Sequence, residues 1–107
     1  MRHHNYYVYI ITNPDGTVLY TGVTNDIENR LYEHYLNRGN EKTFAGKYHC
    51  YNLLYFEQYQ YIRSAIAREK EIKGWTRKRK LDLIKTENAE LKVLNDCMPP
   101  VATAGWC

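Results

Sequence analysis

The chain has 107 residues, of which 44% are hydrophobic and 25% charged, so it suits one compact folded domain and not two. Its three cysteines show no CxxC spacing, which argues against paired disulfides and a zinc site and favours free thiols in a reducing cytoplasm. No signal peptide is visible, and no segment approaches the roughly 18 apolar residues of a membrane span, so a membrane protein is not expected.

The net charge of +3 is modest, but it is distributed unevenly. Residues 63–80 hold eight basic and two acidic side chains, a local charge of +6, which leaves −3 on the rest of the chain. Such a basic band indicates a polyanionic partner such as nucleic acid. An ordinary solvated helix surface has the same composition and is the alternative.

The N-terminal part of the chain predicts a β-hairpin. Residues 5–13 (NYYVYIITN) and 17–23 (TVLYTGV) are aromatic and β-branched, which is typical of strands. The residues between them, Asn13-Pro14-Asp15-Gly16, are typical of a turn. Gly22, inside the second strand, indicates a close backbone approach or a bulge.

A helix is predicted directly after this hairpin. Asn25 or Asp26 is expected to cap it, and Glu28 is placed to complete a capping box with Asn25. The helix is expected to run to about Asn37, with Ile27 starting an apolar stripe of four-residue spacing.

The second half of the chain predicts one strand and two helices. Residues 37–49 are polar with two glycines and predict a loop, and residues 52–59 predict a third strand. A second helix is expected from about Ser64 to Lys73, ended by Gly74, and a third over residues 77–87, capped by Thr76. The tail, residues 96–107, has two prolines and no periodicity and is expected to be poorly ordered.

The order of these elements, β-β-α-β-α-α, predicts the fold class. We expect an α/β protein of the α+β kind, with a small three-stranded, mainly antiparallel sheet flanked by helices. One domain is expected over residues 5–95.

Two tyrosines on the predicted hairpin are candidates for chemistry. Tyr7 and Tyr9 share a face of the first strand, because side chains alternate with period two. Tyr20 lies across the hairpin, so the hydroxyls of Tyr9 and Tyr20 are placed to converge near Gly22. Ordinary cross-strand aromatic packing explains the same pattern and stays open.

Arg30 and His34 lie four residues apart on the first predicted helix. Measured from Ile27 at 100° per residue, both border the apolar stripe and turn toward the sheet. An arginine so placed can bind phosphate through its bidentate fork. A surface arginine and a packed histidine are the alternative.

Glu69 lies within the apolar face of the second predicted helix, at helical spacing from Ile62, Ala65 and Ile66. Burying a carboxylate is costly unless a partner compensates its charge. One candidate partner is Lys73, at i+4 in the favourable order. The other is a hard cation such as Mg²⁺, which takes few protein carboxylates and keeps waters and phosphate oxygens.

Taken together, these motifs resemble the GIY-YIG nuclease superfamily. The resemblance is carried, in order, by Tyr7-Val8-Tyr9, Tyr20-Thr21-Gly22, Arg30-Leu31-Tyr32-Glu33-His34 and a later helix with Glu69. The closer resemblance is to small stand-alone bacterial members, which are similar to the nuclease domain of the bacterial excinuclease ABC. The stretches YTGVTNDIENRLYEH and AIAREKEIKGWTRKRKLDLI carry it, and it covers about residues 5–95.

The resemblance implies phosphodiester hydrolysis with one divalent metal, Mg²⁺ or Mn²⁺. Tyr9 and Tyr20 match the signature tyrosines, one of which activates the nucleophile directly or through a water. Arg30 matches the arginine that stabilises phosphate charge, His34 a position that assists proton transfer, and Glu69 the metal-binding glutamate. A tyrosine with its ordinary pKa of about 10 is a poor base, so the metal and Arg30 would have to lower that pKa.

The chain also departs from the family pattern. Tyr7 replaces the first glycine of the signature, and Val23 stands where some members have a lysine. Residues 81–84 occupy the window in which many members have an asparagine, and none is present. The residues expected to replace its phosphate contact, and to bind nucleic acid, are Lys73, Arg77, Lys78, Arg79 and Lys80.

The function expected from these observations is that of a metal-dependent DNA endonuclease, in repair or recombination. Branched, damaged and single-stranded DNA are the candidate substrates, and a cytoplasmic monomer or weak homodimer is expected. The alternative is a nucleic-acid-binding module that does not cut and uses the basic band, residues 63–80. A protein-interaction domain without nucleic-acid binding is a third, weaker hypothesis.

Overall fold

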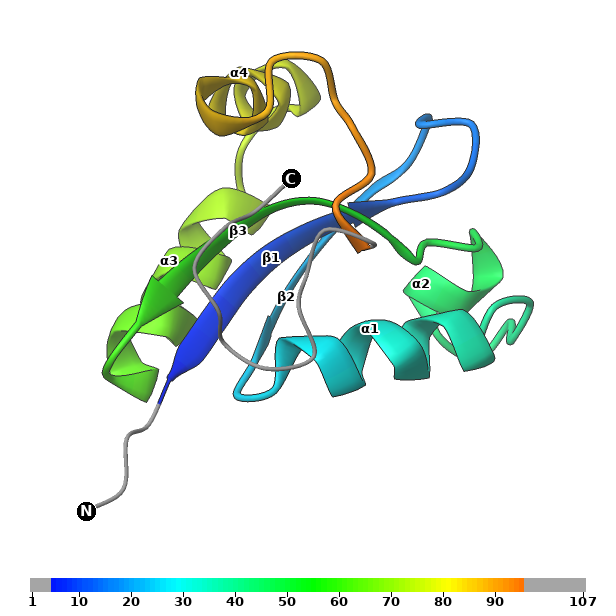
Figure 1. The fold of residues 1–107 in the computed structure, drawn as a ribbon, viewed down its shortest axis with the longest axis horizontal. Coiled ribbons are helices and arrows are strands. Elements are labelled where there is room, and N and C mark those ends of the chain that lie inside the picture. The colour runs from blue at the N-terminus through cyan, green and yellow to red at the C-terminus, as the bar shows by residue number, and fades with distance from the viewer. Residues whose placement is uncertain (1–4, 96–107) are drawn as a thin grey trace.

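The computed structural model describes residues 5–95 and shows a three-stranded sheet with helices on both faces (Figure 1). Its elements, in chain order, are β1 (Tyr6–Thr12), β2 (Leu19–Thr24), α1 (Ile27–Leu36), α2 (Phe44–Lys47), β3 (Asn52–Tyr59), α3 (Ile62–Lys73) and α4 (Arg77–Glu87). The predicted fold class is therefore confirmed. The prediction that residues 37–49 form only a loop was wrong, since α2 lies there.

The sheet is antiparallel throughout, with strand order β2-β1-β3, so β1 is central. The predicted hairpin is confirmed, and its register pairs Tyr9 with Gly22 and Ile11 with Tyr20. Because paired residues share a face and residues two apart share a face, all four lie on one side of the sheet. This register places both signature tyrosines on the same face.

Two hydrophobic clusters occupy the two faces of the sheet. On one face, Tyr9 and Ile11 pack with residues of α1 and α2, among them Leu31. On the other face, Val8 and Ile10 pack with residues of α3 and α4. Figure 1 shows α1 and α3 on opposite sides of the sheet. A side chain of α3 can therefore approach Tyr9 and Tyr20, which lie on the opposite face, only around an edge strand of the sheet.

The hairpin turn shortens β2 relative to the prediction, which placed its start at residue 17. Asn13 Oδ1 accepts hydrogen bonds from the backbone N–H groups of Thr17, at 2.8 Å, and Val18, at 3.0 Å. These donors are consequently used within the turn, and pairing of the strand begins at Leu19. Gly16 adopts a φ of 70°, a left-handed conformation that glycine reaches without steric cost.

Asp26 caps α1, with its Oδ1 accepting from the N–H of Asn29 at 3.1 Å. That places Asn29 and not Glu28 at the third helical position, so the predicted capping box with Asn25 was wrong. The predicted cap of α4 is confirmed, because Thr76 Oγ1 accepts from the backbone N–H of Arg79 at 3.2 Å. Each cap satisfies one helix-end donor and so fixes where its helix begins.

The start of α3 was predicted too late in the chain. The helix begins at Ile62, and its N-cap residue, Tyr61, makes no side-chain capping bond. Because a capping side chain is absent there, the sequence offers no cap signal and Ser64 looked like the first candidate. Gly74 ends α3 as predicted.

Residues 88–95 run back along the outer edge of β3. The side chain of Asn88 donates to the carbonyl of Leu54 at 2.9 Å and to that of Lys92 at 2.8 Å, and Asn95 Oδ1 accepts from the N–H of Leu53 at 2.7 Å. The predicted tail, residues 96–107, lies outside the described residues. In the described part, residues 5–95, no helix is long and apolar enough to cross a membrane.

Candidate active site

A buried tyrosine–histidine pair lies at the centre of the predicted site. Tyr9 on β1 is 1% exposed and His34 on α1 is 7% exposed. The Tyr9 hydroxyl and His34 Nε2 are 2.8 Å apart, which is hydrogen-bonding distance. An ideal Cβ on Gly22 would lie 2.5 Å from Tyr9 Cζ, so the phenol ring lies directly across that glycine. The predicted close approach at Gly22 is thus present, with a side chain as the approaching group.

Tyr20 on β2 adjoins this pair. Its ring centroid lies 6.5 Å from that of Tyr9 and 5.6 Å from that of His34, with the latter contact edge-on. Tyr20 is half-buried, so it is the more accessible of the two tyrosines. The three rings form one cluster. It contains both the cross-strand aromatic packing expected from the hairpin and the hydrogen bond between Tyr9 and His34.

Burial sets the protonation of the pair. It lowers the pKa of His34 to about 4, with the nearby charge of Arg30 adding to the shift. Burial also raises the pKa of Tyr9 to about 12, although Arg30 acts in the opposite direction. At neutral pH the imidazole is therefore neutral and the phenol protonated, so the hydroxyl donates and Nε2 accepts. Burial outweighs the opposing effect of Arg30 on the pKa of Tyr9, so Arg30 alone does not supply the lowering that a tyrosine base would need.

Arg30 links the buried pair to solvent. Its NH1 lies 3.0 Å from Glu33 Oε1, and its side chain is 42% exposed. A hydrogen bond to Tyr9 contributes most to raising the pKa of Arg30, so the guanidinium stays charged. The predicted position of Arg30, at the border between the apolar stripe and the solvent face, leaves a permanent cation beside the tyrosine hydroxyl.

Glu69 on α3 approaches the same cluster from the other face of the sheet. Its side chain is 13% exposed, and its Oε2 lies 2.7 Å from Lys73 Nζ. That ammonium lies 5.8 Å from the centroid of the Tyr20 ring, on the edge strand β2. The charge of Glu69 also acts to raise the pKa of Tyr9. Glu69 is therefore linked to Tyr20 at the β2 edge through Lys73, and the ion pair with Lys73 anticipated from the i+4 spacing is formed.

At this site, Glu69 is the carboxylate that would bind a metal ion. Within residues 5–95 no group of three or more His, Cys, Asp or Glu side chains is close enough to hold a metal. The described residues therefore do not by themselves form a complete set of metal ligands. A lone carboxylate such as Glu69 suits Mg²⁺, which commonly completes its octahedron with waters and substrate phosphate oxygens.

The other predicted nucleic-acid-binding residues make contacts within the chain. Arg77 donates to the carbonyl oxygens of Thr17 at 2.7 Å and Gly16 at 2.8 Å, which ties α4 to the hairpin turn. Lys78 Nζ lies 3.0 Å from Asp82 Oδ2, and the guanidinium of Arg79 lies 4.0 Å from the centroid of the Trp75 ring. Lys80 is half-buried. Of the five, only Lys73 has a described contact with the tyrosine cluster.

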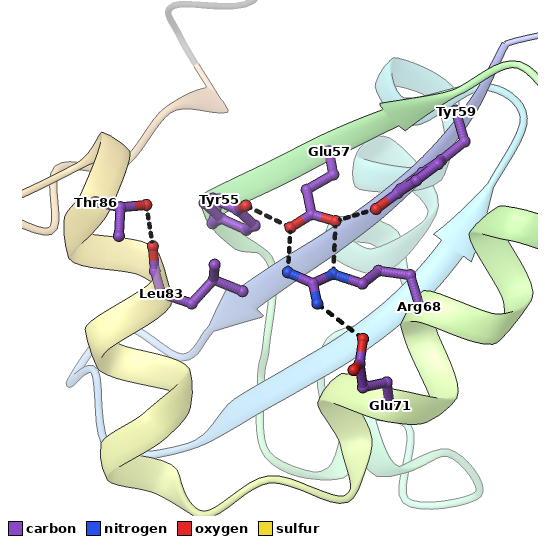
Figure 2. A network of polar contacts seen from close by, with 7 residues as sticks. All are labelled: Tyr55, Glu57, Tyr59, Arg68, Glu71, Leu83 and Thr86. Carbon is purple, nitrogen blue, oxygen red and sulfur yellow. Dashed lines mark hydrogen bonds and ion pairs between the residues drawn. The ribbon is translucent and has the colours of Figure 1, made fainter.

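Sequence reasoning missed a polar network that fixes α3 on the sheet (Figure 2). Glu57 on β3 accepts from Arg68 Nε at 2.9 Å and NH2 at 3.0 Å, and also from the hydroxyls of Tyr55 at 2.5 Å and Tyr59 at 2.6 Å. Arg68 NH1 donates further to Glu71 at 2.8 Å. The sequence does place the polar groups of Tyr55, Glu57 and Tyr59 at every second position of β3, which predicts that these side chains share a face. It does not predict that Arg68, eleven residues after Glu57, pairs with that carboxylate.

Burial opposes ionisation of Glu57, but the hydrogen bonds from Arg68 and the two tyrosines outweigh it and lower the pKa of that carboxyl. The carboxylate is therefore charged at neutral pH and held by a bidentate guanidinium. Because Arg68 directly precedes Glu69, this clamp also fixes the turn of α3 that presents Glu69 to the β2 edge.

The fold and the site together define a class of protein. A small antiparallel sheet holds a buried tyrosine–histidine pair, an arginine and a half-buried carboxylate. The model of the GIY-YIG catalytic domain matches residues 5–82. The chain belongs to the GIY-YIG nuclease family.

Relatives among bacterial proteins agree with this. A UPF0213 protein of Staphylococcus aureus strain Mu3 is 40% identical over 81 residues, which cover 76% of this chain and 95% of that protein. A UPF0213 protein of Bacillus pumilus is 39% identical over 80 residues, covering 75% of this chain and 79% of the relative. The solution NMR structure of a UPF0213 protein of Bacillus halodurans matches with a TM-score of 0.51 and 29% identity, over 80% of this chain and 88% of that one.

Proposed function

We propose that this protein is a divalent-metal-dependent endonuclease that hydrolyses phosphodiester bonds in DNA. The observation that carries the proposal is the 2.8 Å contact between the Tyr9 hydroxyl and His34 Nε2, buried beside Arg30. A neutral imidazole hydrogen-bonded to a tyrosine hydroxyl, next to a permanent cation, places a proton acceptor and a phosphate-binding group side by side. Membership of the GIY-YIG family supports the same reaction.

In the proposed mechanism, a water beside Tyr9 attacks the phosphorus atom. Tyr9 takes the water's proton as it passes its own to His34 Nε2, so the phenol relays a proton and never accumulates as phenolate. Before substrate binds, Tyr9 is protonated and His34 neutral, so the proton acceptor is free to receive it. The bound phosphodiester's negative charge counteracts Arg30 and makes His34 a stronger base than in the free protein.

Arg30 binds the scissile phosphate and stabilises the charge that develops on its oxygens. Tyr20 lines the same phosphate position and orients the attacking water from the solvent side of the cluster. Glu69 would hold a Mg²⁺ or Mn²⁺ ion, whose chemistry when bound is to polarise the phosphate and stabilise the leaving oxygen. Lys73, 2.7 Å from Glu69, would contact a phosphate of the DNA beside the metal site.

The test is cleavage of single-stranded, branched and duplex DNA with Mg²⁺ or Mn²⁺, comparing the wild type with Glu69→Ala. We expect cleavage by the wild type and a loss on the order of a hundred-fold or more in the variant, since the metal and its charge stabilisation are removed. Glu90→Ala is the control, because it removes a carboxylate that is 73% exposed and lies outside the site and the α3 network. Equal traces of cleavage by wild type and Glu69→Ala would reject the proposal.

The alternative, a binding module that does not cut, rests on the basic band. Several of its cations are paired inside the protein: Arg68 with Glu57, Lys73 with Glu69, and Lys78 with Asp82. The charge that the band presents to a partner is therefore smaller than its sequence suggests. Binding that persists without metal, falls steeply with salt and gives no product would favour this alternative.

A further inference from the structure

A row of aromatic rings leads from the candidate active site to solvent. The ring of Phe44 stacks on that of Tyr20, with centroids 6.1 Å apart and planes 25° from parallel. Tyr48 continues the row, 4.9 Å from Phe44. Phe44 is 52% exposed and Tyr48 39% exposed. The row therefore begins at a predicted catalytic tyrosine and ends in two rings that are partly exposed to solvent.

The short helix α2 holds this row in place. Its middle residues, Ala45 and Gly46, are buried, while Phe44 and Tyr48 on either side point outward. A Cβ on Gly46 would lie 2.5 Å from the carbonyl oxygen of Asn40, so α2 lies tight against the loop that follows α1. The backbone under Phe44 is thus fixed, and the exposure of its ring is imposed by how α2 packs.

Cations flank the row. Lys47 Nζ lies 5.4 Å from the centroid of the Tyr48 ring, and Lys73 Nζ lies 5.8 Å from that of Tyr20. Residues 38–49 also contain Arg38 and Lys42, against a single acidic residue. Exposed aromatic rings interleaved with cations suit a single strand of nucleic acid, whose bases stack while its phosphates are neutralised. The bases of a duplex are already stacked on each other and cannot use such a row.

We propose that Phe44 is a stacking platform for one unpaired nucleobase next to the scissile phosphate, and that Tyr48 extends it. The favoured substrate is then DNA that is single-stranded at the point of cleavage. This inference rests on the proposed function, because it takes the scissile phosphate to lie beside Tyr20.

Binding is measured by fluorescence anisotropy of short labelled DNA with the full chain in EDTA, so that no cleavage occurs. The probes are a single strand, its duplex, and the same strand with abasic sites, which keeps the phosphates and removes the bases. For Phe44→Ala we expect about ten-fold weaker binding of the single strand, the typical scale for loss of one stacking ring. Binding of the duplex and of the abasic strand should stay within about two-fold of wild type, because neither offers a free base.

Two further variants separate stacking from general damage. Phe44→Trp keeps a ring and should bind the single strand at least as well as the wild type, with its fluorescence quenched by the stacked base. Tyr61→Ala removes another exposed ring, 65% exposed against 52% for Phe44, and should not change binding, because the Tyr61 side chain makes no capping bond to α3. Unchanged single-strand binding by Phe44→Ala, or an equal loss on all three probes, would overturn the platform.

The outcomes also separate this inference from the proposed hydrolysis. Phe44-dependent binding of single strands without any cleavage in Mg²⁺ or Mn²⁺ supports the platform and rejects the enzyme. Cleavage of single strands and duplex alike, indifferent to Phe44→Ala, supports the enzyme and rejects the platform.

Discussion

Gly22 fills a position that no larger residue can take without moving Tyr9. Its Cβ would lie 2.5 Å from Tyr9 Cζ, and Tyr9 is 1% exposed, so the ring has no open space to move into. The steric demand comes from a neighbouring side chain, since Gly22 is a regular strand residue paired with Tyr9. The glycine of the second motif is thus a condition for the Tyr9–His34 contact.

Gly22→Ala should therefore damage the site more than the fold. We expect a loss of stability of roughly 1–3 kcal/mol from overpacking. Cleavage should fall by about a hundred-fold or more, because the displaced phenol loses its hydrogen bond to His34 and its place as proton relay. Urea denaturation and a DNA cleavage assay measure the two effects.

Gly74→Ala is the matched control, since a Cβ there would come no closer than 3.5 Å to its neighbours and φ is −79°. That variant should keep both stability and cleavage. Wild-type cleavage by Gly22→Ala would show that the Tyr9–His34 contact is dispensable.

Two adjacent residues of the helix α3, Arg68 and Glu69, face different edge strands of the sheet. Arg68 turns toward β3 and binds Glu57 in a bidentate pair (Figure 2). Glu69 instead pairs with Lys73, whose ammonium lies beside Tyr20 on β2. The side chains of Glu57 and Arg68 are 15% and 25% exposed. The helix is thereby held between the two edge strands of the sheet, and its rotation about its own axis is fixed.

Arg68→Met should loosen this attachment. The variant leaves the Glu57 carboxylate half-buried without its cation, and we expect a loss of about 2–3 kcal/mol, below the range for fully buried pairs because Arg68 keeps some exposure. Lys78→Met is the control, since that pair is exposed and should cost less than about 1 kcal/mol. Equal midpoints for the two variants in urea would show that the network does not hold α3.

The sequence predicted the long elements well because their signals are local. The third strand was placed at its observed ends, and α4 was placed by Thr76, whose hydroxyl caps it. The four-residue helix α2 was missed, since one turn has no periodicity to detect. The Glu57–Arg68 pair was missed for another reason: its partners come from two elements, and only the packing of α3 on the sheet brings them together.

The same distinction holds for the candidate site. Spacing alone placed Tyr9, Tyr20, Arg30 and His34 on faces that meet, and the structure brings them together. Their protonation could not be predicted, because the pKa values of Tyr9 and His34 depend on how completely α1 covers the sheet. Phe44 was not a candidate, since its position beside Tyr20 follows from the packing of α2.

For the whole molecule, burying a neutral histidine makes stability depend on pH. The pKa of His34 falls from 6.5 to about 4 on folding, so between these values the unfolded chain binds a proton that the folded chain does not. Stability is therefore complete above about pH 6.5 and is lost as pH falls toward 4. The expected loss between pH 7 and pH 5 is on the order of 2 kcal/mol, measured as the free energy of unfolding in urea at each pH.

His34→Gln tests the assignment of this slope. The variant starts less stable, because a buried ring and its hydrogen bond are lost, but its stability should change little between pH 7 and pH 5. Glu57, a half-buried carboxyl with a lowered pKa, loses its contribution only below its ordinary value of 4.5, so it lies outside this window. His49→Gln should keep the full slope, since His49 is exposed. If His34→Gln retains the wild-type slope, the imidazole is not buried neutral, and Tyr9 has no acceptor for its proton.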